Sequence, residues 1–173
     1  MRKWYMLTLV GRDQSAIVAK VTSALFEVGC NLGEASMARL GGNFTIMMMV
    51  SSELSESGLR NSLEPVVASL DLHLHLDVIK GHLHQHVTPD VMITVSGADR
   101  TGIVAEVTDT LAEAGLSILD LSSDVAGSEL KPIYIMQIEG HAANGVEPIE
   151  QAIQGIKAQG VDVHLQEIET LIG

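Results

Sequence analysis

The stretch that decides the fold occurs twice: MLTLVGRDQSAIVAKVTSALFEVGCNL spans residues 6–32, and MITVSGADRTGIVAEVTDTLAEAGLSI spans residues 92–118. The two segments align without a gap at a constant offset of 86, and 12 of their 27 positions are identical. Unrelated segments of average composition would share roughly two positions. An internal repeat of this kind predicts two copies of one structural unit and directs the search for function to the repeated residues.

The second half of each copy is less similar, but its order of elements can still be followed. Beyond residue 40 we align the copies at an offset of 89, which assigns three extra residues near 128–131 to the second copy. At this offset Ile46-Met47 matches Ile135-Met136, and His75-Leu76 matches His164-Leu165. The repeat therefore predicts a first domain at residues 1–80, a linker at 81–89 and a second domain at 90–173, with no segment left over for a separate catalytic domain.

Each copy shows the pattern of strands and helices expected for a β-α-β-β-α-β unit. Apolar and polar side chains alternate in the strand segments, and apolar side chains recur at helical spacing in the helix segments. In the first copy the expected elements are strands at 4–10, 31–40, 44–50 and 72–77 and helices at 17–28 and 56–70. Gly29 and Gly115 are placed to end the first helix of each copy. The predicted fold class is α+β: two ferredoxin-like βαββαβ units, each an antiparallel four-stranded sheet with both helices on one face.

One predicted strand is apolar on both of its faces. Residues 44–50 read FTIMMMV, whereas a strand with one face in water alternates with polar side chains. Two helices cover only one face of a sheet, so the other face needs a cover from the other copy or from a second chain. We therefore expect a homo-oligomer, most simply a homodimer, although a Met-rich central strand with modest exposure is the alternative.

Composition excludes several classes of protein. Twenty-two acidic residues against ten basic ones give a net charge of −12, which phosphate backbones repel, so direct binding of nucleic acid is not expected. The single cysteine, Cys30, forms no internal disulfide and follows a helix-ending glycine, as a small buried residue would. We find neither a signal peptide nor an apolar run long enough to span a membrane, and expect a cytoplasmic protein.

The connection between the first strand and the first helix of each copy is the segment best suited to chemistry. It reads GRDQSAIV at residues 11–18 and GADRTGIV at residues 97–104. A glycine here lets the backbone approach a ligand, and Asp13 or Asp99 can cap the following helix or bind an ammonium group. The free N–H groups of the helix suit a carboxylate, so the loop matches the two charges of an amino acid. The alternative is a well-formed turn with a capped helix and no ligand.

The stretch GADRTGIVAEVTDTLAEAGLSI resembles the opening motif of ACT domains, and nearly the whole chain is similar to the glycine cleavage system transcriptional repressor family of tandem ACT proteins. The resemblance implies binding of a small amino acid, glycine or similar, at an interface between units. Carried over by position, it implies these ligand-binding residues: Gly11, Asp13, Gln14, Ser15, Ala16, Ile17 and Asn31 in the first copy, and Gly97, Asp99, Arg100, Thr101, Gly102 and Ile103 in the second. The copies depart from the motif at Gln14 and Ala16, which replace Arg and Gly, and at Ser117, which replaces Asn.

The resemblance further implies an amino-acid-sensing regulatory protein that modulates transcription of glycine cleavage genes. Because the chain is acidic, we expect it to act through a protein partner such as a transcriptional activator. No catalytic motif and no cofactor cradle is found, so we expect neither an enzyme nor a cofactor. Two alternatives remain: a dimerisation scaffold without a ligand, and a metal-binding protein that uses five histidines, His73, His75, His82, His84 and His86. The sequence does not reveal which amino acid binds or which loop is the working site.

Overall fold

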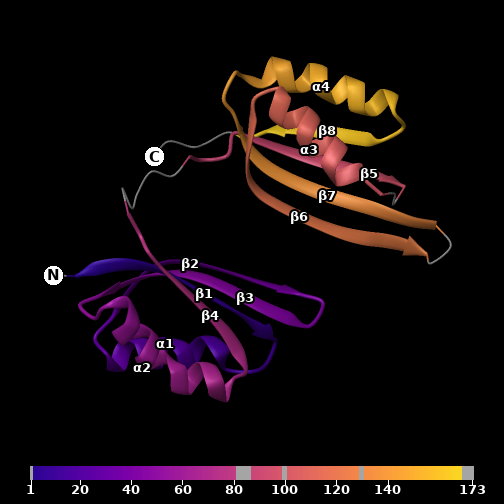
Figure 1. The fold of residues 1–173 in the computed structure, drawn as a ribbon. Helices are drawn as coiled ribbons and strands as arrows, with labels where there is room; N and C mark the ends of the chain where they lie inside the picture. Colours follow the sequence, from indigo (N-terminus) through magenta and orange to yellow (C-terminus); the bar gives the residue numbers. More distant parts are fainter. Residues whose placement is uncertain (1, 81–86, 99–100, 129–130, 169–173) are drawn as a thin grey trace. The chain divides into compact units, whose positions relative to one another are not determined.

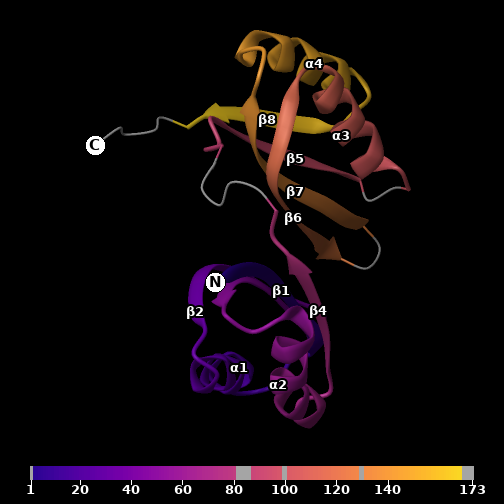
Figure 2. The ribbon, with the colours of Figure 1, turned by 60° about the vertical axis from the view of Figure 1, so that its left-hand side comes forward.

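The computed structural model describes residues 2–80, 87–98, 101–128 and 131–168. The chain divides into two compact units, Met1–His84 and Gln85–Gly173, each built around its own sheet. In each unit both helices lie on one face of a four-stranded antiparallel sheet (Figures 1 and 2). The expected βαββαβ fold is thus confirmed for both copies of the repeat.

Unit 1 follows the expected order of elements closely. Its strands pair in the order β2-β3-β1-β4, so β2 and β4 are the edges of the sheet. The elements are β1 (Lys3–Arg12), α1 (Ile17–Glu27), β2 (Asn31–Leu40), β3 (Asn43–Ser52), α2 (Glu56–Ser69) and β4 (Leu72–Val78). Helix α1 ends before Gly29, whose φ of 70° is the left-handed conformation that glycine adopts without strain.

Unit 2 repeats this topology with a longer β6–β7 hairpin. The strand order is β6-β7-β5-β8, with β6 and β8 at the edges. The elements are β5 (Val91–Ala98), α3 (Ile103–Glu113), β6 (Leu116–Ser128), β7 (Lys131–Ala142), α4 (Val146–Ala158) and β8 (Asp162–Glu167). Gly115, with φ 92°, follows α3 as Gly29 follows α1.

Each unit has its own hydrophobic core. Each core lies between the sheet and its two helices and consists mainly of aliphatic side chains. In unit 1 the helices contribute Ile17, Val21 and Leu25 from α1, and Leu59, Leu63 and Val67 from α2. This spacing of four residues places the apolar side chains on one face of each helix, which is the amphipathic pattern expected from the sequence. Cys30 is buried at the edge of the same core and has no disulfide partner.

The strand register corrects one part of the sequence alignment. Leu9 of β1 lies opposite Ile46 of β3, and its counterpart Val95 lies opposite Met136 of β7, so these two strands correspond at an offset of 90 rather than 89. Ile46 and Met136 are both buried, whereas Ile135, which the alignment matched to Ile46, is half-buried. The identical Ile-Met pairs were misleading because a shift of one residue transfers a side chain to the opposite face of the sheet. The offset of 89 does hold for β4 and β8.

The face of the unit 1 sheet that carries no helix is rich in methionine. Met47 is 48% exposed on this face, and Met6, Met47 and Met49 line a hollow of about 260 Å³. Strand β2 is exposed along its whole length. The two apolar faces of β3 are thus placed differently: one packs in the core, and the other is an uncovered surface of its unit.

Candidate functional site

The loop between β1 and α1 begins at a glycine that packing requires. Gly11 remains within β1, paired with Phe44 on one side and Leu72 on the other. A Cβ at this position would lie 2.6 Å from Cδ2 of Leu72 and 3.1 Å from the carbonyl oxygen of Asp71. The glycine thus allows β4 to approach β1. The expectation that Gly11 clears space for a ligand is not supported by this geometry.

Asp13 is held by the β2–β3 hairpin and does not cap α1. Its backbone N–H donates to the carbonyl of Gly42 at 2.9 Å, and its carboxylate accepts a hydrogen bond from the guanidinium of Arg39. The N-cap of α1 is Ala16, which has no side-chain acceptor, so the capping role expected for Asp13 is wrong. The N-terminal N–H groups of α1 therefore have no side-chain cap, while the aspartate forms an ion pair instead.

Gln14 and Ala16 give the loop its shape. The side-chain amide of Gln14 donates to the carbonyl of Leu70 at 2.6 Å, which ties the loop to the C-terminal end of α2. Ala16 has φ 65°, in the left-handed region, where its counterpart Gly102 has φ 90°. A residue with a Cβ is strained in this region, so the loop keeps the conformation of the glycine motif even where alanine has replaced the glycine.

An open cavity of about 360 Å³ lies beside this loop. Its lining combines four residues singled out in the sequence with five that were not. The predicted ones are Asp13, Gln14, Ala16 and Ile17; the additional ones are Val18, Ala19, Met37, Arg39 and Phe44. The cavity therefore brings together a carboxylate, a guanidinium and the start of a helix, with apolar side chains around them.

Besides Gly11, two other predicted residues of unit 1 do not line this cavity. Ser15 is an exposed turn residue that does not line the cavity. Asn31 begins β2 opposite Ser51, whereas Arg39 lies near the other end of the same strand opposite Phe44. Eight residues of extended chain separate Asn31 from Arg39, roughly 26 Å. Within unit 1, Asn31 is thus not part of the cavity at the loop.

The corresponding loop of unit 2 is described only in part, because Asp99 and Arg100 lie outside the described residues. Gly97 remains in β5 opposite Tyr134, Thr101 and Gly102 form an exposed turn, and Ile103 is buried at the start of α3. By register, the counterpart of Arg39 is Val125, which lies opposite Tyr134 as Arg39 lies opposite Phe44. The strand arginine of the first copy thus has no counterpart at the equivalent position of the second.

The histidine-rich segment shows no metal centre in the part of the chain that is described. His73 and His75 are exposed on β4, and Nε2 of His75 lies 2.8 Å from Oδ2 of Asp77. His82, His84 and His86 lie outside the described residues. Among the residues that are described, no three potential ligands come together to hold a metal ion. Over the same ranges, none of the helices is long and apolar enough to cross a membrane.

Comparison with known families identifies both units. The sequence profile of the ACT domain matches residues 5–77 and again residues 90–166, which is most of the chain. The chain belongs to the ACT domain family. The two matches coincide with the two βαββαβ units, so each unit is one ACT domain.

Several known proteins are similar to this tandem ACT protein over most of its length. It is 25% identical over 158 residues to the glycine cleavage system transcriptional repressor of Escherichia coli, a match that covers 88% of this chain and 83% of that protein. Its fold resembles that of a protein of unknown function from Galdieria sulphuraria, with a TM-score of 0.81 and 22% identity over 98% of this chain and all of the other. A second solved structure, described as a glycine cleavage system transcriptional repressor, covers 98% of this chain and 99% of its own, with a TM-score of 0.71 and 20% identity.

Proposed function

We propose that this ACT protein is a non-catalytic regulator that senses a small amino acid, glycine or a similar one, and modulates transcription of glycine cleavage genes through a protein partner. The observation that carries the proposal is the cavity beside the β1–α1 loop, where the Asp13 carboxylate and the Arg39 guanidinium stand together at an uncapped helix N-terminus. The relationship to a repressor of the glycine cleavage system supplies the biological context.

The charges at this site match those of a zwitterion. An amino acid carries an ammonium group and a carboxylate on one carbon, so it can pair with Asp13 and Arg39 at the same time. The N–H groups of Ile17, Val18 and Ala19 at the start of α1 add partial positive charge near the place of the ligand carboxylate. The volume of about 360 Å³ lies at the small end of ligand pockets, which suits a small amino acid.

Asp13 and Arg39 currently satisfy each other, so binding replaces one ion pair with two. The side chain of Asp13 is only 21% exposed, whereas that of Arg39 is 66% exposed and has room to move. A ligand that separates the two residues would move Arg39 on β2 relative to the loop. Binding shifts the equilibrium between the two arrangements only if they bind the ligand with different affinity. Edge strand β2 is thus the element through which binding would reach other surfaces.

Isothermal titration calorimetry with glycine, serine and larger amino acids tests the site. Glycine should give a saturable heat, and Asp13→Asn and Arg39→Gln should each abolish it. The matched control is Arg2→Gln, because Arg2 also faces a carboxylate in unit 1, that of Glu53 at 3.9 Å, but lies at the opposite end of β1 from the loop. Heats no larger than those of dilution for every amino acid would favour a scaffold without a ligand.

The partner-dependent part of the proposal requires a separate test. With a net charge of −12, the purified chain alone should not shift promoter DNA in a gel, whereas adding the DNA-bound activator should give a larger complex that responds to the amino acid. Tight binding of promoter DNA by the chain alone would contradict the proposed mechanism.

We also propose that the protein forms homodimers, with the methionine-lined sheet face of unit 1 as part of the contact. Met6, Met47 and Met49 present an adaptable apolar surface that water would otherwise cover. Sedimentation equilibrium should show a dimer, and Met47→Glu should shift it toward the monomer, while Met48→Leu in the core should not. A monomer at all concentrations would refute this part.

A further inference from the structure

The two ACT units differ at the groove between the last helix and the edge strand that follows it. In unit 2 this groove, between α4 and β8, has a volume of about 520 Å³. It is lined by one face of α4 and by two residues of β8: Glu147, Glu150, Gln151, Ile153, Gln154 and Lys157 from the helix, and His164 and Leu165 from the strand. The groove lies outside the repeated strand–loop–helix segment, and the amino-acid site proposed above does not use it.

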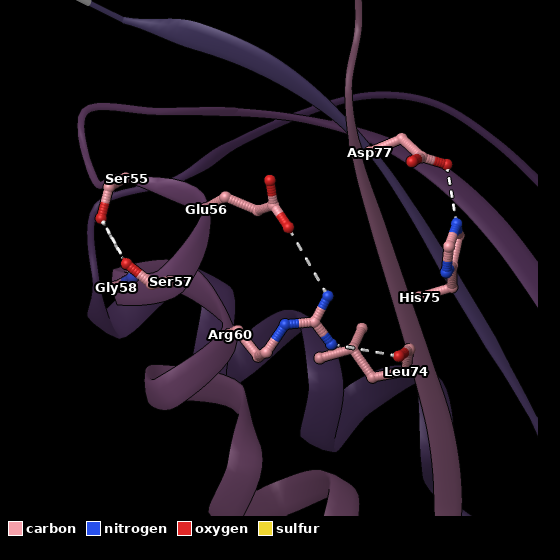
Figure 3. Close-up of polar contacts among 8 residues, drawn as sticks. All are labelled: Ser55, Glu56, Ser57, Gly58, Arg60, Leu74, His75 and Asp77. Carbon is pink, nitrogen blue, oxygen red and sulfur yellow. Dashed lines mark hydrogen bonds and ion pairs between the residues drawn. The ribbon is translucent and has the colours of Figure 1, made fainter.

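In unit 1 the corresponding strand edge is covered by an arginine. Arg60 of α2 donates from Nη1 to the carbonyl oxygen of Leu74 on β4 at 3.3 Å, and its Nη2 lies 3.7 Å from Oε1 of Glu56 (Figure 3). Within the described part of the chain β4 is an edge strand that pairs with β1, so a carbonyl that α2 can reach points to the unpaired side of the strand. Arg60 thus occupies the position that an additional strand would need.

In unit 2 the residue at this position has the opposite charge. Arg60 follows buried Leu59, and Glu150 follows the equivalent buried Ile149, so Arg60 and Glu150 correspond. The counterpart of Leu74 is Val163, since these residues lie opposite Leu9 and Val95. A glutamate carboxylate has no proton to donate, so it cannot cover the carbonyl of Val163 as Arg60 covers that of Leu74.

We propose that the α4–β8 groove of unit 2 binds an extended, basic peptide segment of a partner protein. The segment adds to the open edge of β8 as a fifth strand, where backbone hydrogen bonds supply affinity and alternate side chains face α4. Charge complementarity selects a basic sequence: Glu147 and Glu150 line the groove, and Asp162 and Glu167 lie on β8, against Lys157 alone. The peptide segment would belong to the protein partner of the proposed function. The proposal rests on that function only in that it requires such a partner to exist.

The charge distribution also predicts the position of the basic residues. A short turn joins the end of α4 to the start of β8, so the N-terminal part of α4 lies toward the end of β8. Glu147, Glu150 and Glu167 therefore gather toward the end of the strand, and Lys157 toward its start. Basic side chains of the bound segment are expected opposite the three glutamates.

The test uses the full chain and a fluorescein-labelled seven-residue peptide of alternating lysine and threonine. Fluorescence anisotropy should show saturable binding, and amide NMR signals of β8 and α4 should shift. A peptide with glutamate in place of lysine should bind at least about tenfold more weakly, since like charges face each other. A lysine–threonine peptide N-methylated at alternate backbone nitrogens should lose binding, because it cannot pair with the strand. Equal binding of the N-methylated peptide, or shifts confined to other elements, would overturn the proposal.

Two variants exploit the difference between the units. Glu150→Arg copies Arg60 and should weaken binding about tenfold or more, whereas Glu113→Arg at the end of α3 makes the same charge change outside the groove and should have little effect. Arg60→Ala uncovers β4 and should add a second set of shifted signals in unit 1. Equal loss of binding in both charge variants would reduce the effect to overall charge and refute the groove. Glycine binding at Asp13 and Arg39 serves as the independent readout, so failure of one proposal leaves the other measurable.

Discussion

Exchanging alanine and glycine between the two loops should change the stability of the two units in opposite directions. Ala16 and Gly102 are the N-caps of α1 and α3, with φ 65° and 90°, and neither uses a side chain to cap its helix. Ala16→Gly should stabilise unit 1, and Gly102→Ala should destabilise unit 2. A Cβ added at Gly102 meets no atom within 4 Å, so the effect there comes from the backbone alone.

The magnitude follows from two opposing terms. The left-handed conformation costs an L-residue about 1–2 kcal/mol, and the greater freedom of glycine in the unfolded chain offsets about 0.4–1 kcal/mol of this. The free energy of unfolding should therefore change by about 1 kcal/mol in each direction. For a unit of this size, that corresponds to a shift of about 4–8 °C in Tm.

Guanidinium unfolding of the full chain, followed by NMR signals from each unit, measures the two changes separately. Gly155→Ala is the control, because Gly155 lies inside α4, has no positive φ and has open space around its Cα. There the alanine should stabilise by about 0.5–1 kcal/mol, the opposite sign to Gly102→Ala. If Gly102→Ala stabilised unit 2 as Gly155→Ala does, the assignment of strain to the left-handed loop position would be refuted.

Two further substitutions test the packing and the anchoring of the same loop. Gly11→Ala should destabilise unit 1 by about 1–3 kcal/mol, because the new Cβ would meet the Leu72 side chain at 2.6 Å. Gly97→Ala should be nearly neutral, since the nearest neighbour of its new Cβ is 3.6 Å away. Thermal unfolding of the two variants should show this contrast, and equal Tm values would contradict it. Gln14→Ala should cost about 1 kcal/mol through loss of the bond to the Leu70 carbonyl, and hydrogen exchange in the loop should become faster; unchanged exchange would show that this bond does not anchor the loop.

The repeated segment by itself determined the architecture of this protein. Identities in the strand–loop–helix segments and the local periodicity predicted two βαββαβ units, because side-chain spacing and helix-ending glycines such as Gly29 act within a few residues. The same local information placed the candidate site at the β1–α1 loop, where four of the predicted residues do line a cavity.

Only the tertiary structure decided what those loop residues do. Arg39 reaches Asp13 because the β2–β3 hairpin returns to β1, a contact across 26 residues that no local pattern contains. The pairing of β5 with β7 sets the 90-residue offset of β7, and the pairing of β1 with β4 places Leu72 against Gly11. The packing of the last helix also decides which side chain lies beside the edge strand: Arg60 donates to β4 in unit 1, whereas Glu150 lines the groove beside β8 in unit 2. Strand register and long-range packing set these contacts, since a backbone hydrogen bond in a sheet joins residues whatever their separation in the chain.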